Sequence, residues 1–158
     1  MILRVMIVED EDMIRNGLVK TLPWADMGCT VIGSAGDGKS GLEQIIERRP
    51  DVVITDIRMP EMDGFEMLER ALAVYRFHII IFTSYAEFDY AQKAISIHAY
   101  DYLLKPLDEK RLAELLARIR EMEEPQEQLE TPGSFSAEEL LKRLAYTDEY
   151  VETALRRI

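Results

Sequence analysis

Apolar positions along residues 1–122 follow two alternating patterns, and together these patterns predict the secondary structure. Short runs rich in β-branched side chains are typical of strands that are buried on both faces. We expect five such strands, at residues 2–8, 30–35, 51–56, 78–84 and 100–105. In the segments that follow them, apolar positions recur with the period of an amphipathic helix. These segments predict five helices, at residues 13–22, 38–49, 63–75, 86–97 and 108–122.

Two of the predicted helix ends carry local signals. Asp63, followed three residues later by Glu66, has the spacing of a capping box, so we expect a helix to begin there. The preceding helix stops short of Pro50, because the residue before a proline disfavours helical angles.

The alternation of strands and helices predicts the fold class. It is typical of a parallel sheet that is covered by helices on both faces. Crossovers between parallel strands are right-handed, so we expect an α/β, doubly wound fold with a five-stranded parallel sheet and five helices. This domain should cover residues 1–122.

The character of the sequence changes after this domain. Residues 123–135 contain two prolines, a glycine and several glutamates, and we interpret them as a linker. Residues 136–158 are amphipathic, and we expect them to form a helical extension. A single apolar stripe of this length cannot form a core alone, so we interpret the extension as the start of a truncated downstream region.

Composition narrows the class of protein further. The net charge of −11 argues against direct DNA binding by these residues, since phosphate contacts require clustered Lys and Arg. No apolar run is long enough to cross a bilayer, and the single cysteine, Cys29, suits a reducing compartment. We therefore expect a cytoplasmic globular protein that makes no contact with a membrane.

Four of the five predicted strands end on polar side chains. Glu9 and Asp10 follow the first strand, and Asp56 ends the third. Thr83 lies near the end of the fourth strand, and Lys105 ends the fifth. Ligands bind to open parallel sheets at the carboxyl ends of the strands, where the winding reverses. We therefore expect these side chains to meet in one pocket.

Three acids in one pocket favour a bound cation. Two carboxylates about 4 Å apart repel by roughly 4 kcal/mol at an effective dielectric constant of 20. A divalent metal relieves this repulsion, and oxygen ligands suit Mg²⁺. We interpret Asp56 as a nucleophile that takes a phosphoryl group and becomes an acyl phosphate. Lys105 and the Thr83 hydroxyl would stabilise the charge on that group.

Four motifs carry a resemblance to a known family. The stretches "IVEDE", "ITDIRMPEMDG", "FTS" and "YDYLLKP", in that order, resemble the receiver domains of bacterial two-component response regulators, which have a flavodoxin-like fold. The longer stretches "PWADMGCTVIGSAGDG" and "SYAEFDYAQKAISIHAYDYLLKP" resemble the branch that ends in an AraC-type DNA-binding domain. We do not expect that output domain within these 158 residues.

The resemblance implies a role for each polar residue of the pocket. Asp56 would accept the phosphoryl group from a phosphohistidine on a sensor histidine kinase. Asp10 would be the first Mg²⁺ ligand, and Glu9 would act mainly through water. Asp56 and the backbone carbonyl of Arg58 would complete the metal site. Lys105 would contact the phosphoryl group, and its bond to the following proline is expected to be cis.

The resemblance also implies how the signal leaves the pocket. Thr83 and Tyr102 would be a switch pair, in which the threonine hydroxyl moves toward the phosphoryl group and the tyrosine ring follows into the vacated space. Phosphorylation would then promote a homodimer through the fourth helix, fifth strand and fifth helix. Phe88, Tyr90 and Ile97 lie on the fourth helix, and we expect that they cannot all face the core. The output of the whole protein would be transcriptional regulation.

Three positions depart from the family pattern. Glu9 replaces the commoner aspartate, which keeps the charge but lengthens the reach. His98 stands where a helix-ending glycine is usual, so we expect local strain or altered capping there. Leu115 occupies the position of an arginine that forms ion pairs in the winged-helix branch, so a dimer contact cannot be transferred from that branch.

Two other functions remain as alternatives to a switch that phosphorylates and dephosphorylates itself. The first is a pseudo-receiver, an interaction module that never takes phosphate. The second is an aspartate-nucleophile phosphohydrolase. Enzymes of that class resemble each other in having a second aspartate, the general acid, two residues after the nucleophile. Arg58 stands there and cannot donate a proton at neutral pH. We expect Arg58 and Tyr85 instead to flank the pocket entrance and to hinder an attacking water.

Overall fold

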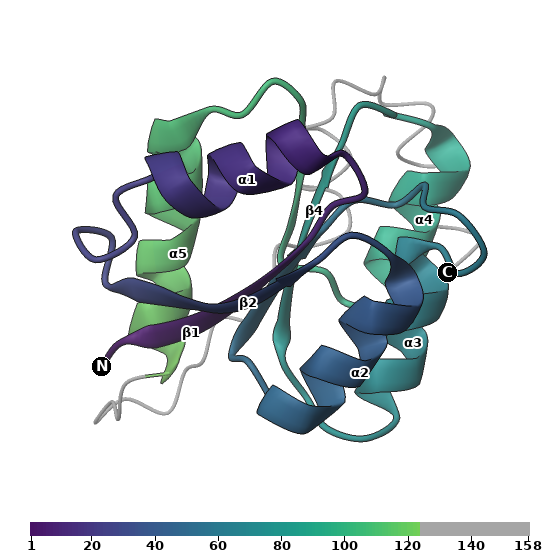
Figure 1. Cartoon of the computed structure of the whole chain (residues 1–158), viewed down its shortest axis with the longest axis horizontal. Helices are drawn as coiled ribbons and strands as arrows, with labels where there is room; N and C mark the ends of the chain where they lie inside the picture. The colour runs from purple at the N-terminus through teal and green to yellow at the C-terminus, as the bar shows by residue number, and fades with distance from the viewer. Residues whose placement is uncertain (124–158) are drawn as a thin grey trace.

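The computed structural model describes residues 1–123, which form a five-stranded sheet between two layers of helices (Figure 1). The strands are β1 (Leu3–Val8), β2 (Cys29–Ala35), β3 (Val52–Thr55), β4 (His78–Thr83) and β5 (Asp101–Leu104). The helices are α1 (Asp12–Thr21), α2 (Gly38–Arg48), α3 (Gly64–Leu72), α4 (Phe88–Ser96) and α5 (Glu109–Glu123). Residues 124–158, with most of the expected linker and all of the expected helical extension, lie outside the described residues.

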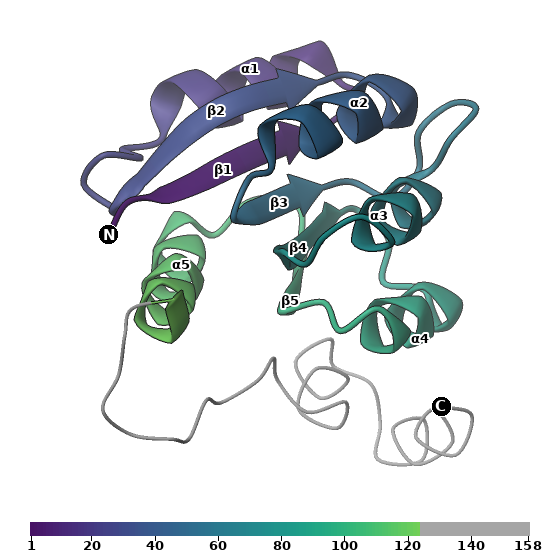
Figure 2. The same ribbon diagram turned by 90° about the horizontal axis from the view of Figure 1, so that it is seen from below.

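The five strands are all parallel, in the order β2-β1-β3-β4-β5 (Figure 2). The winding reverses at β1 and β3, which lie side by side in the middle of the sheet. Their pairing places Val8 opposite Thr55, so the two strands end at the same edge. The doubly wound parallel fold predicted from the sequence is therefore confirmed.

Each strand of the sheet supplies side chains to two separate cores. In β1, Met6 and Val8 point into the core that α2, α3 and α4 cover. Val5 and Ile7, which alternate with them, point into the core that α1 and α5 cover. Successive side chains of a strand face opposite sides, so a continuous apolar run can fill both layers. This explains why the strands have no polar face.

The ends of two helices differ from the sequence prediction. Helix α3 stops at Leu72 rather than continuing to Tyr75, whose ring packs at a tilt against Phe77 and whose hydroxyl donates to the carbonyl of Pro50. Helix α4 begins at Phe88 rather than at residue 86, because Glu87 is extended at the N-cap position. The period of apolar residues does not predict at which residue a helix begins or ends, so differences of a few residues are expected. Among residues 1–123, no helix has both the length and the apolar character needed to span a membrane.

Candidate functional site

The site lies at the carboxyl edge of the sheet, where the predicted polar residues meet. Glu9 and Asp10 directly follow β1, and Asp56 directly follows β3. The three side chains each offer a carboxylate oxygen, and these oxygens lie within 4.8 Å of one another. Glu9 and Asp56 are buried, whereas Asp10 is more exposed. The strand order brings together acids that are far apart in the sequence.

Lys105 joins two of these acids from the neighbouring end of β5. Its Nζ lies 2.5 Å from Oε1 of Glu9 and 2.9 Å from Oδ2 of Asp56. The other oxygen of Asp56 accepts a hydrogen bond of 2.7 Å from the backbone N–H of Ile57. Both oxygens of the buried Asp56 are therefore paired, which compensates for the removal of its charge from water.

Burial dominates the electrostatics of Glu9. It raises the pKa of the Glu9 carboxyl from 4.5 to about 7, and the charge of Asp56 acts in the same direction. Lys105 acts against this shift. Burial alone would lower the pKa of Lys105, but its contacts with Glu9 and Asp56 outweigh burial, and its pKa is raised. The lysine therefore stays charged between the two acids.

A glycine determines how closely α3 approaches the end of β3. A Cβ on Gly64 would lie 2.2 Å from the backbone oxygen of Asp56, so no larger residue fits there without movement of the backbone. The Gly64 N–H donates to the carbonyl of Ile57 at 2.7 Å. Asp63 caps the same helix by accepting from the Glu66 N–H at 2.8 Å, as the sequence predicted. The role of Gly64 was not predicted from the sequence, where its place just after a helix cap was the available signal.

The predicted switch residues lie on neighbouring strands, Thr83 at the end of β4 and Tyr102 in β5. Thr83 is fully buried, and its hydroxyl has no hydrogen-bond partner among residues 1–123. Tyr102 is 3% exposed, and its hydroxyl donates to the backbone carbonyl of Tyr85. The tyrosine ring thus lies inward in this structure. The bond between Lys105 and Pro106 is cis, as expected.

Arg58 makes side-chain contacts that the sequence did not predict. Its guanidinium lies 3.7 Å from the centroid of the Tyr85 ring. Its Nε donates to the Tyr90 hydroxyl at 2.8 Å, and its Nη2 pairs with Glu87. Arg58 and Tyr85 are therefore neighbours, as expected of two residues that flank one entrance. Their effect on an attacking water, and the metal-ligand role of the Arg58 carbonyl, stay predictions.

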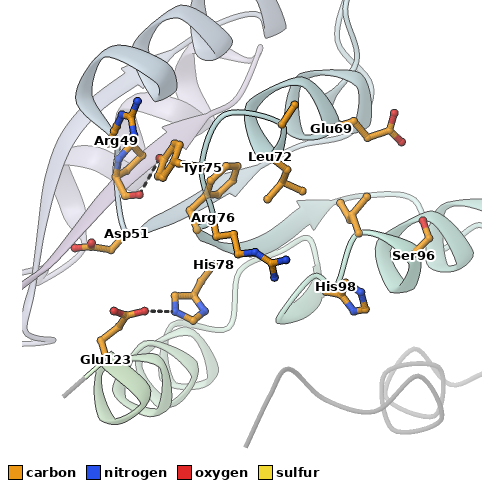
Figure 3. A pocket seen from close by; sticks show the side chains of 14 residues that line it. Arg49, Asp51, Glu69, Leu72, Tyr75, Arg76, His78, Ser96, His98 and Glu123 are labelled. Atoms are coloured by element: carbon orange, nitrogen blue, oxygen red, sulfur yellow. Dashed lines mark hydrogen bonds and ion pairs between the residues drawn. The ribbon is translucent and has the colours of Figure 1, made fainter. Parts of the chain in front are cut away.

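A hollow of about 770 Å³ lies at the opposite edge of the sheet (Figure 3). Two of its charged side chains pair with each other, and a third accepts from a backbone N–H. His78 contacts Glu123 at 2.6 Å, and Asp51 accepts from the backbone N–H of Arg4 at 2.9 Å. His98, which also lines it, is exposed and follows the C-cap of α4. This hollow is remote from the buried acids, so the candidate site is the acid cluster at the carboxyl edge.

Comparison with protein families agrees with this geometry. A family model described as "Response regulator receiver domain" matches residues 5–117. This range includes every residue of the acid cluster and Lys105.

Individual relatives give the same result. An "Uncharacterized response regulatory protein" from Staphylococcus epidermidis is 36% identical over 157 residues, and "Transcriptional regulatory protein HptR" from Staphylococcus aureus is 37% identical over 158. Each alignment covers 98% of this chain and 62% of the relative, so the chain spans less than two thirds of these proteins. Among solved structures, the REC domain of AraT, a response regulator from Geobacillus stearothermophilus, is 39% identical with a TM-score of 0.70, and the match covers 77% of this chain and 95% of that one.

Proposed function

Because the chain belongs to the response regulator receiver family, we propose that it is a phosphorylation-activated switch in which Asp56 accepts a phosphoryl group from a sensor histidine kinase. The observation that carries this proposal is the pairing of Asp56 with Lys105 at 2.9 Å beside two further acids. A buried carboxylate with a mobile cation against one oxygen is suited to attack on a phosphoryl donor, and to holding the product.

The chain's own residues account for most of the chemistry. A carboxylate oxygen of Asp56 forms a bond to phosphorus as the phosphorus–nitrogen bond of the donor phosphohistidine breaks, and the imidazole leaves. The Lys105 ammonium then moves from pairing the free carboxylate to pairing the phosphoryl oxygens. The buried hydroxyl of Thr83, which has no partner among the described residues, is available to donate to the same group.

The acid cluster fits a Mg²⁺ ion, because three carboxylate oxygens within 4.8 Å form an all-oxygen donor set. We propose that Asp10, Asp56 and the backbone carbonyl of Arg58 hold the ion, with Glu9 acting mainly through water. When bound, Mg²⁺ neutralises charge on the phosphoryl group and its attacking carboxylate. The close contact between Lys105 and Glu9 supports this proposal, because it places one positive charge beside the acid cluster.

The surface around Lys105 supports a docking partner. A hollow of about 590 Å³ opens between α1 and the β5–α5 loop, and Lys105 and Ser84 line it. Met13, at the start of α1, is 89% exposed although it is apolar. We propose that the kinase segment that carries the phosphohistidine packs against α1 at this hollow, which places its imidazole beside Asp56.

We propose that the output is transcriptional and cytoplasmic. The Staphylococcus aureus relative is named a transcriptional regulatory protein, and it extends beyond the part that matches. Within this chain we propose a receiver domain at residues 1–122, a linker at 123–135 and a helical extension at 136–158 that continues toward an AraC-type DNA-binding domain. DNA contacts would belong to that domain, since the net charge of −11 disfavours them here.

Intact-mass measurement tests the proposal directly. We expect the wild type, incubated with acetyl phosphate and Mg²⁺, to gain one phosphoryl group, and the Asp56→Asn variant to gain none. Asp37→Asn is a matched control, because Asp37 caps α2 and is not a member of the acid cluster, so its substitution should leave the gain intact. No gain in the wild type would favour the pseudo-receiver alternative, and continuous hydrolysis of phosphate esters would favour the phosphohydrolase.

A further inference from the structure

The side chain of Arg58 connects the two loops that flank the acid cluster. Arg58 follows Asp56 by two residues and lies in the loop that leads to α3. All three of its partners belong to the other loop and the first turn of α4: the ring of Tyr85, the carboxylate of Glu87 and the hydroxyl of Tyr90. We call these four residues the Arg58 tie.

The chemistry of the tie requires an arginine. The flat guanidinium stacks on Tyr85 at 3.7 Å while its edge donates from Nε to Tyr90 and from Nη2 to Glu87. A lysine provides one compact charge and cannot stack and donate in two directions at once. Glu87 makes no side-chain cap for α4, although it occupies the N-cap position. Its carboxylate is directed to Arg58 instead.

The tie and the switch tyrosine hold the same residue from two sides. Arg58 covers the ring of Tyr85, while the Tyr102 hydroxyl donates to the Tyr85 backbone carbonyl. Tyr102 can make that bond only while its ring is inward, where it is 3% exposed. Because Arg58 holds Tyr85 in place, it also favours the buried position of Tyr102.

We propose that the Arg58 tie holds the β4–α4 loop in the arrangement that buries Tyr102, and so sets the resting equilibrium of the switch before any phosphoryl group arrives. Arg58 is thus a positioning residue that acts through Tyr85. The regulatory consequence rests on the proposed function of Asp56, whereas the effect on Tyr102 in the resting protein does not. A cation–π contact together with an exposed ion pair and a hydrogen bond shifts a two-state equilibrium by about tenfold.

The test uses the full chain with a fluorinated tyrosine placed only at position 102, observed by fluorine NMR without a phosphodonor. We expect the ratio of inward to outward Tyr102 to fall about tenfold in Arg58→Ala. Arg58→Lys, which keeps the charge near Glu87, should give an intermediate ratio. Glu87→Gln and Tyr90→Phe remove the tie from its other end, and each should lower the ratio by less than Arg58→Ala does.

Arg70→Ala is the matched control. Arg70 pairs with Glu66 at 2.9 Å on the surface of α3, so this variant removes the same charge and a comparable ion pair without touching the β4–α4 loop. An unchanged ratio in Arg58→Ala, or an equal fall in Arg70→Ala, would overturn the proposal.

Beryllium fluoride with Mg²⁺, added as a phosphoryl mimic, separates this proposal from the proposed function. We expect it to restore the inward ring in Arg58→Ala, because the mimic supplies the bias that the tie no longer provides. If the inward ring is lost in Arg58→Ala and not regained with the mimic, a reversible bias is excluded. A wild type that does not bind the mimic would count against Asp56 as acceptor, while the resting ratios would still decide the role of the tie.

Discussion

At the scale of single residues, the proposed acceptor Asp56 depends on neighbours of very different chemistry. Lys105 balances its charge, and Gly64 allows the backbone of α3 to pass against it. The first contribution is electrostatic and is expected to depend on pH and on metal. The second is steric and is expected to depend on neither.

Gly64→Ala should lower the free energy of unfolding by about 1–3 kcal/mol, as for other overpacked sites. The added methyl group would meet the backbone of Asp56 and Ile57, which cannot move as a flexible side chain does. Urea denaturation measures this change. Gly17→Ala is the control, because Gly17 lies in α1 with nothing within 4 Å of its Cβ position, and an alanine there should stabilise by about 1 kcal/mol. Equal effects at the two glycines would contradict the steric account.

Glu9 should make stability depend on pH when Mg²⁺ is chelated. Its pKa is raised from 4.5 to about 7 in the folded protein, so the folded state binds more protons than the unfolded state between these values. The contribution of Glu9 is therefore full below about pH 4.5 and is lost as the pH rises through 7. At high pH the buried Glu9 carboxylate is charged and destabilises the folded state. A glutamine at this position cannot be charged, so this loss of stability with rising pH is absent in the variant.

The measurement is the difference in unfolding free energy between Glu9→Gln and wild type at pH 5 and at pH 8. We expect the variant to gain on the order of 2 kcal/mol of unfolding free energy relative to the wild type when the pH rises from 5 to 8. The lost ion pair with Lys105 adds an offset of its own, so the change with pH is the informative quantity. A difference that does not vary with pH would refute the raised pKa.

At the scale of elements, the helix ends determine where the loops of the site begin. Helix α3 starts with a side-chain cap at Asp63 and leads the chain away from Asp56. Helix α4 ends in a Schellman motif, in which Ala99 N–H donates to Ala94 and His98 N–H donates to Ile95. His98 has a φ of 58°, a left-handed conformation that favours glycine, and this supports the local strain expected from the sequence.

His98→Gly should raise the free energy of unfolding by roughly 1 kcal/mol, because it relieves the left-handed strain at the end of α4. The flexibility that glycine adds to the unfolded chain offsets part of the gain. His98→Val is the contrasting variant, since a β-branched residue is poorly tolerated at positive φ and should destabilise. Thermal and urea denaturation of the three proteins would show the order Gly, His, Val from most to least stable. Any other order would argue against strain as the cause.

At the scale of the whole molecule, the face formed by α4, β5 and α5 is less apolar than the sequence suggested. Phe88, Tyr90 and Ile97 are all partly buried and pack against the core that α2, α3 and α4 cover. The expectation that they could not all face the core is therefore wrong. Leu104, at the end of β5, is 39% exposed. Arg111 is paired with the buried Asp101 within the same chain, at 2.6 Å.

We still predict that phosphorylation promotes a homodimer through this face, since the proposed switch pair, Thr83 and Tyr102, borders it. Sedimentation velocity with and without acetyl phosphate measures the change, and a phosphorylated sample should approach twice the monomer mass. Leu104→Lys should weaken the dimer by placing a charge at an exposed apolar position. Val74→Lys, a comparable change at an exposed apolar residue after α3, should not. A monomer under both conditions would rule this prediction out.

The sequence by itself determined the features that depend on periodicity and on residue type. Alternating apolar runs and amphipathic segments predicted the parallel sheet, because burial on both faces leaves a clear pattern in each strand. The acids and the lysine were predicted to meet because strand ends share one edge in such a sheet. Local signals such as the cap at Asp63 were equally readable.

Only the tertiary structure decided which surface side chains meet. The Arg58 tie joins residues up to 32 positions apart in the sequence, and no sequence pattern around any of them predicts these contacts. The fit of Gly64 against Asp56 and the inward position of Tyr102 also depend on how two loops are placed in space. A single side chain can form many such contacts at similar free energy, and the packing of the surrounding helices selects among them.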